Sequence, residues 1–168
     1  MLTLAAILSI FVYGIIAAML GTILPDISKR FNLGPKQNGN IAMAQAVGLM
    51  IGSFFAGPIM DVQGKKVGLL IGLGLVVVAL VGLRAATGYA MVAGLMLLLG
   101  TGGGAIVNGA NALPPDIQIE GLTTAGVFNL LNLFFGLGGL VTPLIAAKLF
   151  RNQSGNLLIF ASGLTALT

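Results

Sequence analysis

The sequence predicts an all-α fold, a polytopic bundle of membrane-spanning helices, from three observations. Of the 168 residues, 57% are apolar and only 7% are charged, whereas roughly a quarter of the residues in a soluble globular domain are charged. The mean hydropathy is +1.07. The apolar residues gather in stretches of about twenty, the length at which a helix crosses a bilayer. A lipid bilayer is therefore the expected surroundings of this chain.

The predicted spans follow one another, separated by short polar or proline-containing breaks. The first starts beside Met1 without a basic leader, so we interpret it as a mature helix and not as a signal peptide. Pro25-Asp26 is predicted to end it. The last span is too short to cross at about 1.5 Å per residue, so we expect the chain to be a fragment. The expected spans, within one domain of residues 1–168, are 2–24, 41–60, 67–83, 89–113, 122–147 and 157–168.

The composition argues against several classes of function. Eight Lys and Arg against four acids give a net charge of +4, but the basic residues stand singly or in pairs between apolar stretches. This pattern is typical of anchoring at a bilayer and not of nucleic-acid binding. The chain has no Cys and no His, the residues that zinc sites and many nucleophilic catalysts require. We therefore expect no metal, no cofactor and no enzymatic activity.

Glycine is abundant, with 26 residues, and several glycines are four residues apart. In lipid, where helix association depends on packing, this spacing lets two helix backbones approach closely. We interpret most of these glycines as packing residues. The clearest pairs are Gly48 with Gly52, Gly68 with Gly72, and Gly100 with Gly104.

Polar side chains form one stripe on the fourth span and another on the fifth, at spacings that place each stripe on one helix face. Carboxamides in lipid are costly unless they are paired or face a wet cavity. They either line a cavity, where their donors and acceptors suit sugar hydroxyls, or bridge helix to helix. The stripes consist of Thr101, Gly104, Asn108 and Asn111, and of Ala125, Asn129, Asn132, Gly136 and Gly139.

Two further polar side chains lie inside the first two spans. Tyr13 is near the middle of the first, where its ring could stack on a sugar or pack in the core. Gln45 lies in the second span, and we favour a bridge between helices for it over solute binding. The candidate solute-binding residues are thus Tyr13, Gln45, Asn108, Asn111, Asn129 and Asn132.

The turn between the second and third spans carries a motif: Gly57, three residues, Asp61, two residues, Gly64, then Lys65 and Lys66. Gly57 permits close packing, Asp61 can cap a helix N-terminus, and Gly64 allows a positive φ. The lysines suit the head-group region. The segment resembles the signature loop of the major facilitator superfamily. The resemblance implies that residues 1–168 are the N-terminal six-helix half of such a transporter, with its sixth helix truncated.

The fourth and fifth spans resemble a narrower branch, the fucose and hexose proton symporters. That branch carries Glu-Thr-Ala-Ala-Asn-Pro in the fourth helix, where this chain reads Val107-Asn108-Gly109-Ala110-Asn111-Ala112, so the Asn matches and the Glu does not. In the fifth helix the branch has an Asn, a Gln three residues on, then Phe and Gly. The residues in comparable places here are Asn129, Asn132, Phe134 or Phe135, and Gly136 or Gly138.

The resemblance implies transport of a small polar solute, a sugar, by alternating access in the plasma (inner) membrane, with a C-terminal half as partner. All four acids lie at helix ends or in loops, so no intramembrane carboxylate marks proton coupling. Val107 at the Glu position leaves three options: a facilitator, a coupling group in the other half, or a different ion. Efflux of drugs or organic anions is the alternative activity, and a non-transporting membrane scaffold is another.

Two observations oppose this interpretation. With the signature loop in the cytoplasm, only Lys65 and Lys66 are inside, so the positive-inside rule favours the reverse orientation. In addition, Gly100-Thr-Gly-Gly-Gly-Ala105 follows an apolar run, with Glu120 about twenty residues on, as a soluble dinucleotide-binding protein would have. We favour the signature loop over the charge count because its residues match jointly. Five uncharged spans disfavour a soluble dinucleotide-binding domain.

Overall fold

The computed structural model describes residues 2–117, 119, 121–149 and 163. Among these residues there is no strand, and five helices are long and apolar enough to cross a bilayer. This result confirms the all-helical membrane class, while the predicted span at 157–168 lies almost wholly outside the described residues. The elements are α1 (Leu2–Arg30), α2 (Pro35–Gln63), α3 (Lys65–Arg84), α4 (Tyr89–Ala112), the 3-10 helix η1 (Pro114–Asp116) and α5 (Thr124–Leu149).

The first two helices are longer than the sequence analysis expected. Pro25 does not end α1, which continues to Arg30. Proline is tolerated inside membrane helices because neighbouring groups satisfy the freed backbone, and Ile23 and Ile27, on either side of Pro25, are both buried in the core. The polar stretch after Pro35 is helical too, because Pro35 occupies the first turn of α2, where its missing N–H is not needed.

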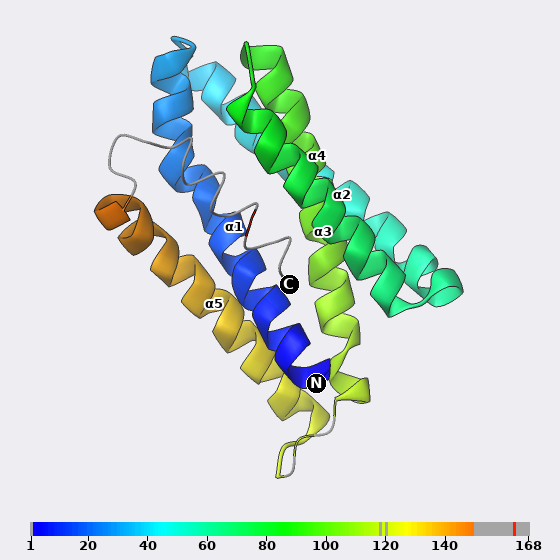
Figure 1. The fold of residues 1–168 in the computed structure, drawn as a ribbon. Coiled ribbons are helices and arrows are strands. Elements are labelled where there is room, and N and C mark those ends of the chain that lie inside the picture. Colours follow the sequence, from blue (N-terminus) through cyan, green and yellow to red (C-terminus); the bar gives the residue numbers. More distant parts are fainter. Residues whose placement is uncertain (1, 118, 120, 150–162, 164–168) are drawn as a thin grey trace.

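The helices form two groups (Figure 1). In one group α1 packs along α5, and in the other α2 and α3 both pack on α4; α1 and α4 share a smaller contact. In an inverted repeat of three helices, α4 is the counterpart of α1 and α5 is the counterpart of α2. The contact between α1 and α5 would then correspond to the contact between α4 and α2. The observed pairing has this arrangement, which the sequence by itself did not reveal.

The seam between α2 and α4 is made by glycines from both helices. A Cβ at Gly52 would overlap the carbonyl oxygen of Thr101, and a Cβ at Gly100 would overlap that of Gln45. Gly48 and Gly104 face partner backbone in the same way. The predicted close packing is therefore confirmed, because each helix leaves room for the backbone of the other. The same glycines, Gly100 to Gly104, lie inside α4 and not in a phosphate-binding loop, so the dinucleotide-binding alternative is wrong.

The α1–α5 seam uses the same device. A Cβ at Gly14 would overlap the Phe135 carbonyl oxygen, and a Cβ at Gly138 would overlap that of Phe11. Thr142 is fully buried beside this seam, and its hydroxyl lies 3.0 Å from the carbonyl oxygens of both Ile15 on α1 and Gly138 on its own helix. A buried hydroxyl in lipid needs such a partner, so Thr142 helps to hold α5 against α1.

The apolar core lies where α1, α3 and α4 meet. Its side chains are almost completely removed from the surface, and they come from all three helices. This core connects the two helix groups, because α1 contributes to it from one side and α3 and α4 from the other. Its largest fully buried members are Ile16, Met19, Ile23, Leu80, Met96 and Ile106, together with Ile41 of α2.

Candidate functional site

The signature loop is a tight turn in which a single residue, Gly64, separates α2 from α3. Gly64 has a φ of 90°, in the region that only glycine adopts readily. Its N–H donates to the Met60 carbonyl oxygen over 2.9 Å and thereby closes the last turn of α2. The expectation of a positive φ at Gly64 is confirmed, and the short turn holds α2 and α3 as a hairpin.

Lys65, the first residue of α3, reaches across to the far end of α4. Its ammonium donates to the Ala112 carbonyl oxygen over 2.7 Å and forms an ion pair with Asp116 in η1 at 2.5 Å. The carbonyls of the last helical turn have no partner within their helix and form the negative end of the helix dipole, so a cation stabilises them. Lys66 is exposed. The loop is therefore joined to the α4–α5 connection through Lys65.

Two roles expected for this motif are wrong in the described bundle. A Cβ at Gly57 would meet no atom within 4 Å, so Gly57 is not needed for close helix packing here. Asp61 is an exposed residue of α2, and the N-terminus of α3 receives no side-chain hydrogen bond, so Asp61 does not cap it. The spacing of the motif residues in the sequence could not show that Gly57 lies on a face of α2 that has no close neighbour.

The middle of the polar stripe of α4, at Gly104 and Asn108, faces α2. Asn108 donates from Nδ2 to the Ser53 carbonyl oxygen over 2.6 Å, and Gly104 packs on the backbone of Leu49. Of the two roles considered for Asn108, the structure therefore shows the bridge between helices. Asn111, one turn further along, is exposed.

The polar stripe of α5 is open. Asn129 and Asn132 are both exposed, and a Cβ at Gly136 would meet no atom within 4 Å. Asn132 donates from Nδ2 to the Phe128 carbonyl oxygen of its own helix over 2.9 Å. The face of α5 that packs on α1 is a different one, which carries Gly138 and Thr142.

Tyr13 belongs to the core. Its side chain is 5% exposed, and its ring stacks on Phe135 with 5.8 Å between the ring centroids. The hydroxyl lies over Gly103 of α4, where a Cβ would overlap it. The structure thus favours the packed-core interpretation of Tyr13 over an aromatic wall facing solute, and it shows a role for Gly103 that the sequence analysis missed.

Among the described residues, Gln45 forms no hydrogen bond to another helix, so the predicted bridge is not present there. Its Oε1 atom is buried and has no hydrogen-bond partner among the described residues. Among those residues, no hydrogen bond joins any two of the six candidate solute-binding residues. The candidates also differ in burial: Asn111, Asn129 and Asn132 are exposed, whereas Tyr13 is packed inside.

Gln45→Met is expected to raise the free energy of unfolding by about 1 kcal/mol, because it replaces an unpaired buried acceptor with an apolar group of similar shape. The apparent melting temperature in detergent, followed by circular dichroism, measures this. Gln37→Met is the control on the same helix, because Gln37 Oε1 accepts a hydrogen bond from the Gly34 N–H at 2.9 Å. It should lower the melting temperature. A lower melting temperature for Gln45→Met would show that Gln45 has a stabilising partner.

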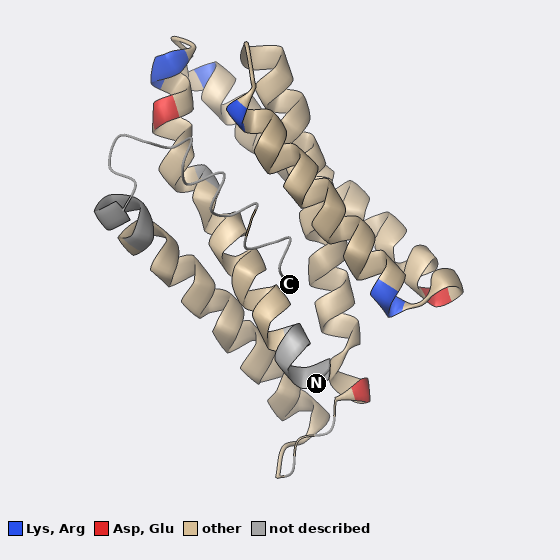
Figure 2. Cartoon of the chain, in the orientation of Figure 1, with Lys and Arg blue, Asp and Glu red and all other residues tan. Residues whose placement is uncertain are grey.

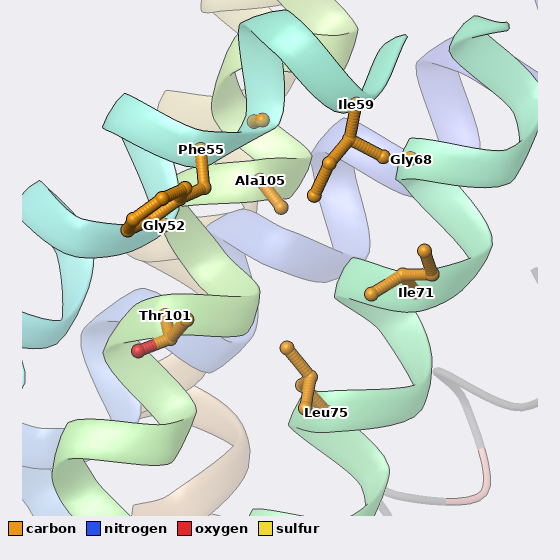
Figure 3. A pocket seen from close by; sticks show the side chains of 9 residues that line it. Gly52, Phe55, Ile59, Gly68, Ile71, Leu75, Thr101 and Ala105 are labelled. Atoms are coloured by element: carbon orange, nitrogen blue, oxygen red, sulfur yellow. The ribbon is translucent and has the colours of Figure 1, made fainter. Parts of the chain in front are cut away.

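A cavity of about 60 Å³ opens between α2 and α3, with α4 as its floor (Figure 3). Its lining is apolar, and the one hydroxyl in it, that of Thr101, donates to the Leu97 carbonyl oxygen. Small-molecule sites usually measure about 300 to 1,000 Å³ and carry several polar groups. This cavity therefore lacks both the volume and the polar groups that a sugar needs. Its lining comprises Gly52, Phe55, Ala56, Ile59, Gly68, Ile71, Leu75, Thr101 and Ala105.

Several structural partners had no clear signal in the sequence. Asp116 was identified as a loop acid, but its pairing with Lys65 spans 51 residues. Arg30 donates from Nη2 to the Ala86 carbonyl oxygen over 3.0 Å and so joins the end of α1 to the loop after α3. A basic residue near a helix end is the only sequence signal for such a contact.

Comparison with known families gives one result that covers nearly the whole chain. The family model described as Major Facilitator Superfamily matches residues 6–168. No curated protein matches the sequence significantly. The matched range includes α2 to α5, all of α1 from residue 6 onward, and the signature loop, in agreement with the helical membrane fold and the Gly64 turn. The chain therefore belongs to the major facilitator superfamily, whose members are multi-pass membrane proteins that transport solutes and are not enzymes.

Proposed function

We propose that this chain is the N-terminal half of an alternating-access carrier for a small polar solute, a sugar, in the plasma (inner) membrane. The polar face of α5 carries the proposal. Asn129 and Asn132 lie in a membrane-spanning helix and are exposed. A carboxamide directed at hydrocarbon is costly, so this face is expected to line a wet cavity or to face a second helix bundle.

A sugar suits the chemistry of these side chains. The Nδ2 group of Asn132 donates to Phe128, which leaves its carbonyl oxygen and one N–H available. Sugar hydroxyls are both donors and acceptors, so an exposed carboxamide can bind one hydroxyl through each of its two ends. Asn111 on α4 is a second exposed carboxamide of this kind.

The signature loop is proposed to act in the conformational change and to lie on the cytoplasmic side. Lys65 connects the start of α3 to the end of α4 and to Asp116, so the hairpin and the α4–α5 connection move as one body. Gly57, Asp61 and Lys66 are left exposed or open at this end. In alternating access this bundle would rock against the C-terminal half around a site near the bilayer midplane.

The test is uptake of labelled hexoses and fucose into proteoliposomes that contain the complete carrier. Asn132→Ala is expected to reduce the initial uptake rate about tenfold, because losing hydrogen bonds to a solute typically costs about 1 to 2 kcal/mol. Its apparent melting temperature should stay close to that of the unmodified protein, because Asn132 bonds only within its own helix among the described residues.

Asn108→Ala is the matched control. Asn108 joins α4 to α2 through the Ser53 carbonyl oxygen, so this variant should lower the melting temperature and should affect uptake only through the amount of folded protein. If the unmodified carrier shows saturable uptake of none of these sugars, the proposed solute class is wrong. Unchanged uptake by Asn132→Ala would remove this residue from the proposed site.

A further inference from the structure

Among the side chains that the structure describes, four basic ones gather at the end of the bundle opposite the signature loop. They come from the ends of α1 and α3 and from the start of α2 (Figure 2). All four side chains are exposed. We call this surface the basic end. It consists of Lys29, Arg30, Lys36 and Arg84.

The basic end gathers positive charges, and among the described residues no carboxylate lies within salt-bridge distance of them. The guanidinium of Arg30 lies 3.5 Å from the Arg84 carbonyl oxygen, so the two arginines are neighbours. Among the described residues, none of the four cations is within salt-bridge distance of a carboxylate, because the ion pair found there joins Lys65 to Asp116 at the other end. Neighbouring like charges repel, so an external anion would stabilise this end.

The two ends of the bundle differ in net charge. Among the residues whose side chains the structure describes, the basic end has its four cations and one acid, Asp26, and so carries a net charge of +3. Among the described residues, the signature-loop end has two lysines and two acids, Asp61 and Asp116, which cancel. Among the described residues, only the basic end therefore has an excess of positive charge that a bound anion would neutralise.

The basic end also lies at the depth where lipid head groups are expected. Each of the four cations is at or next to the end of an apolar span. Tyr89 begins α4 at the same level, and its hydroxyl accepts a hydrogen bond from Asn40 Nδ2. The Arg30 guanidinium lies 5.0 Å from the Phe31 ring centroid. Aromatic and basic residues at the ends of spans are typical of the membrane interface.

We propose that the basic end binds the head group of an anionic phospholipid. The phosphate is held by Lys36 and Arg84, whose side chains make no hydrogen bond among the described residues, and the acyl chains extend along the apolar spans. Arg30 keeps its charge while its N–H groups bond the Arg84 and Ala86 carbonyl oxygens. An anionic lipid suits this end because it supplies the missing negative charge at the depth of the four cations.

The test is binding of labelled phosphatidylglycerol to the purified protein in neutral detergent, followed by fluorescence anisotropy. Unlabelled phosphatidylglycerol should displace the probe at a concentration at least tenfold lower than phosphatidylcholine with the same acyl chains. Lys36→Gln and Arg84→Gln should each weaken binding about fivefold, as expected for about 1 kcal/mol per basic side chain. Arg84→Lys, which keeps the charge, should retain most of the affinity and shows that the protein tolerates substitution there.

Lys66→Gln is the matched control, an exposed lysine at the charge-balanced end, and should change the affinity less than twofold. The proposal would be overturned if phosphatidylcholine bound as tightly as phosphatidylglycerol, if Lys66→Gln weakened binding as much as Lys36→Gln, or if neither basic-end variant lost affinity. Glycerol phosphate, which has no acyl chain, should not compete at concentrations where the lipid does. If it competes equally, the site binds a soluble phosphate compound and not a lipid.

Discussion

Gly52→Ala is expected to lower the free energy of unfolding by about 3 kcal/mol, at the upper end of the usual cost of overpacking. The added methyl group would overlap the carbonyl oxygen of Thr101 on α4. This atom is part of a helix backbone and cannot rotate away, so α2 and α4 must separate along a seam that Gly48, Gly100 and Gly104 also form. The apparent melting temperature of the purified protein in detergent measures the loss.

Gly57→Ala is the control for this prediction on the same helix. A Cβ at Gly57 would meet no atom within 4 Å, and alanine is a better helix former than glycine by about 1 kcal/mol. The control should therefore melt at the same temperature as the unmodified protein or slightly higher. Equal melting temperatures for the two variants would contradict the close contact between α2 and α4.

Lys65→Glu is expected to destabilise the protein by about 2 kcal/mol. The variant loses the bond to the Ala112 carbonyl oxygen, worth about 1 kcal/mol, and places an acid beside Asp116 and the negative end of α4. The Lys65 and Asp116 side chains are 37% and 48% exposed, so solvent screening holds the ion-pair share to about 1 kcal/mol or less. Thermal melting at low and high salt measures the hydrogen-bond and charge contributions together. High salt should reduce the difference in melting temperature between Lys65→Glu and the unmodified protein, because it screens the charge contribution.

The neighbouring lysine provides the control. Lys66→Glu should change the melting temperature little, because Lys66 is exposed and makes no hydrogen bond or ion pair among the described residues. The double variant Lys65→Glu with Asp116→Lys restores opposite charges and should recover part of the loss. Equal losses in Lys65→Glu and Lys66→Glu would show that the contact between α3 and the end of α4 adds no stability.

The signature loop and the helix seams show how far local sequence predicted the structure. Because almost no residues link the second and third spans, the turn between them needs a residue with a positive φ. Gly64 has a positive φ in the structure. The glycine pairs of α2 and α4 were predicted to pack closely, and they do. The turn was predictable because it depends on adjacent residues, and the close packing because the paired glycines lie about one helical turn apart on the same helix.

The candidate site was harder to predict, because its residues depend on which helices become neighbours. Asn108 and Asn132 look alike in the sequence, since each is a carboxamide on the polar stripe of an apolar span. Only the packing of α4 on α2 gives Asn108 a carbonyl partner, whereas the packing of α5 on α1 leaves Asn132 exposed. Tyr13 is buried for the same kind of reason, because Gly103 and Phe135 enclose it.

The sequence by itself determined that this protein is a bundle of membrane helices and a member of its superfamily, since span length, hydropathy and the Gly64 turn are local properties. Tertiary structure decided the rest: that α1 pairs with α5 and α2 with α4, and that Lys65 bonds the end of α4. It also gathers at the basic end four cations that have no salt-bridge partner among the described residues. The physical reason is that every span must be apolar to lie in hydrocarbon, so apolarity does not distinguish the neighbours of one span from those of another. Close backbone approach and a few polar contacts between distant residues then select the neighbours.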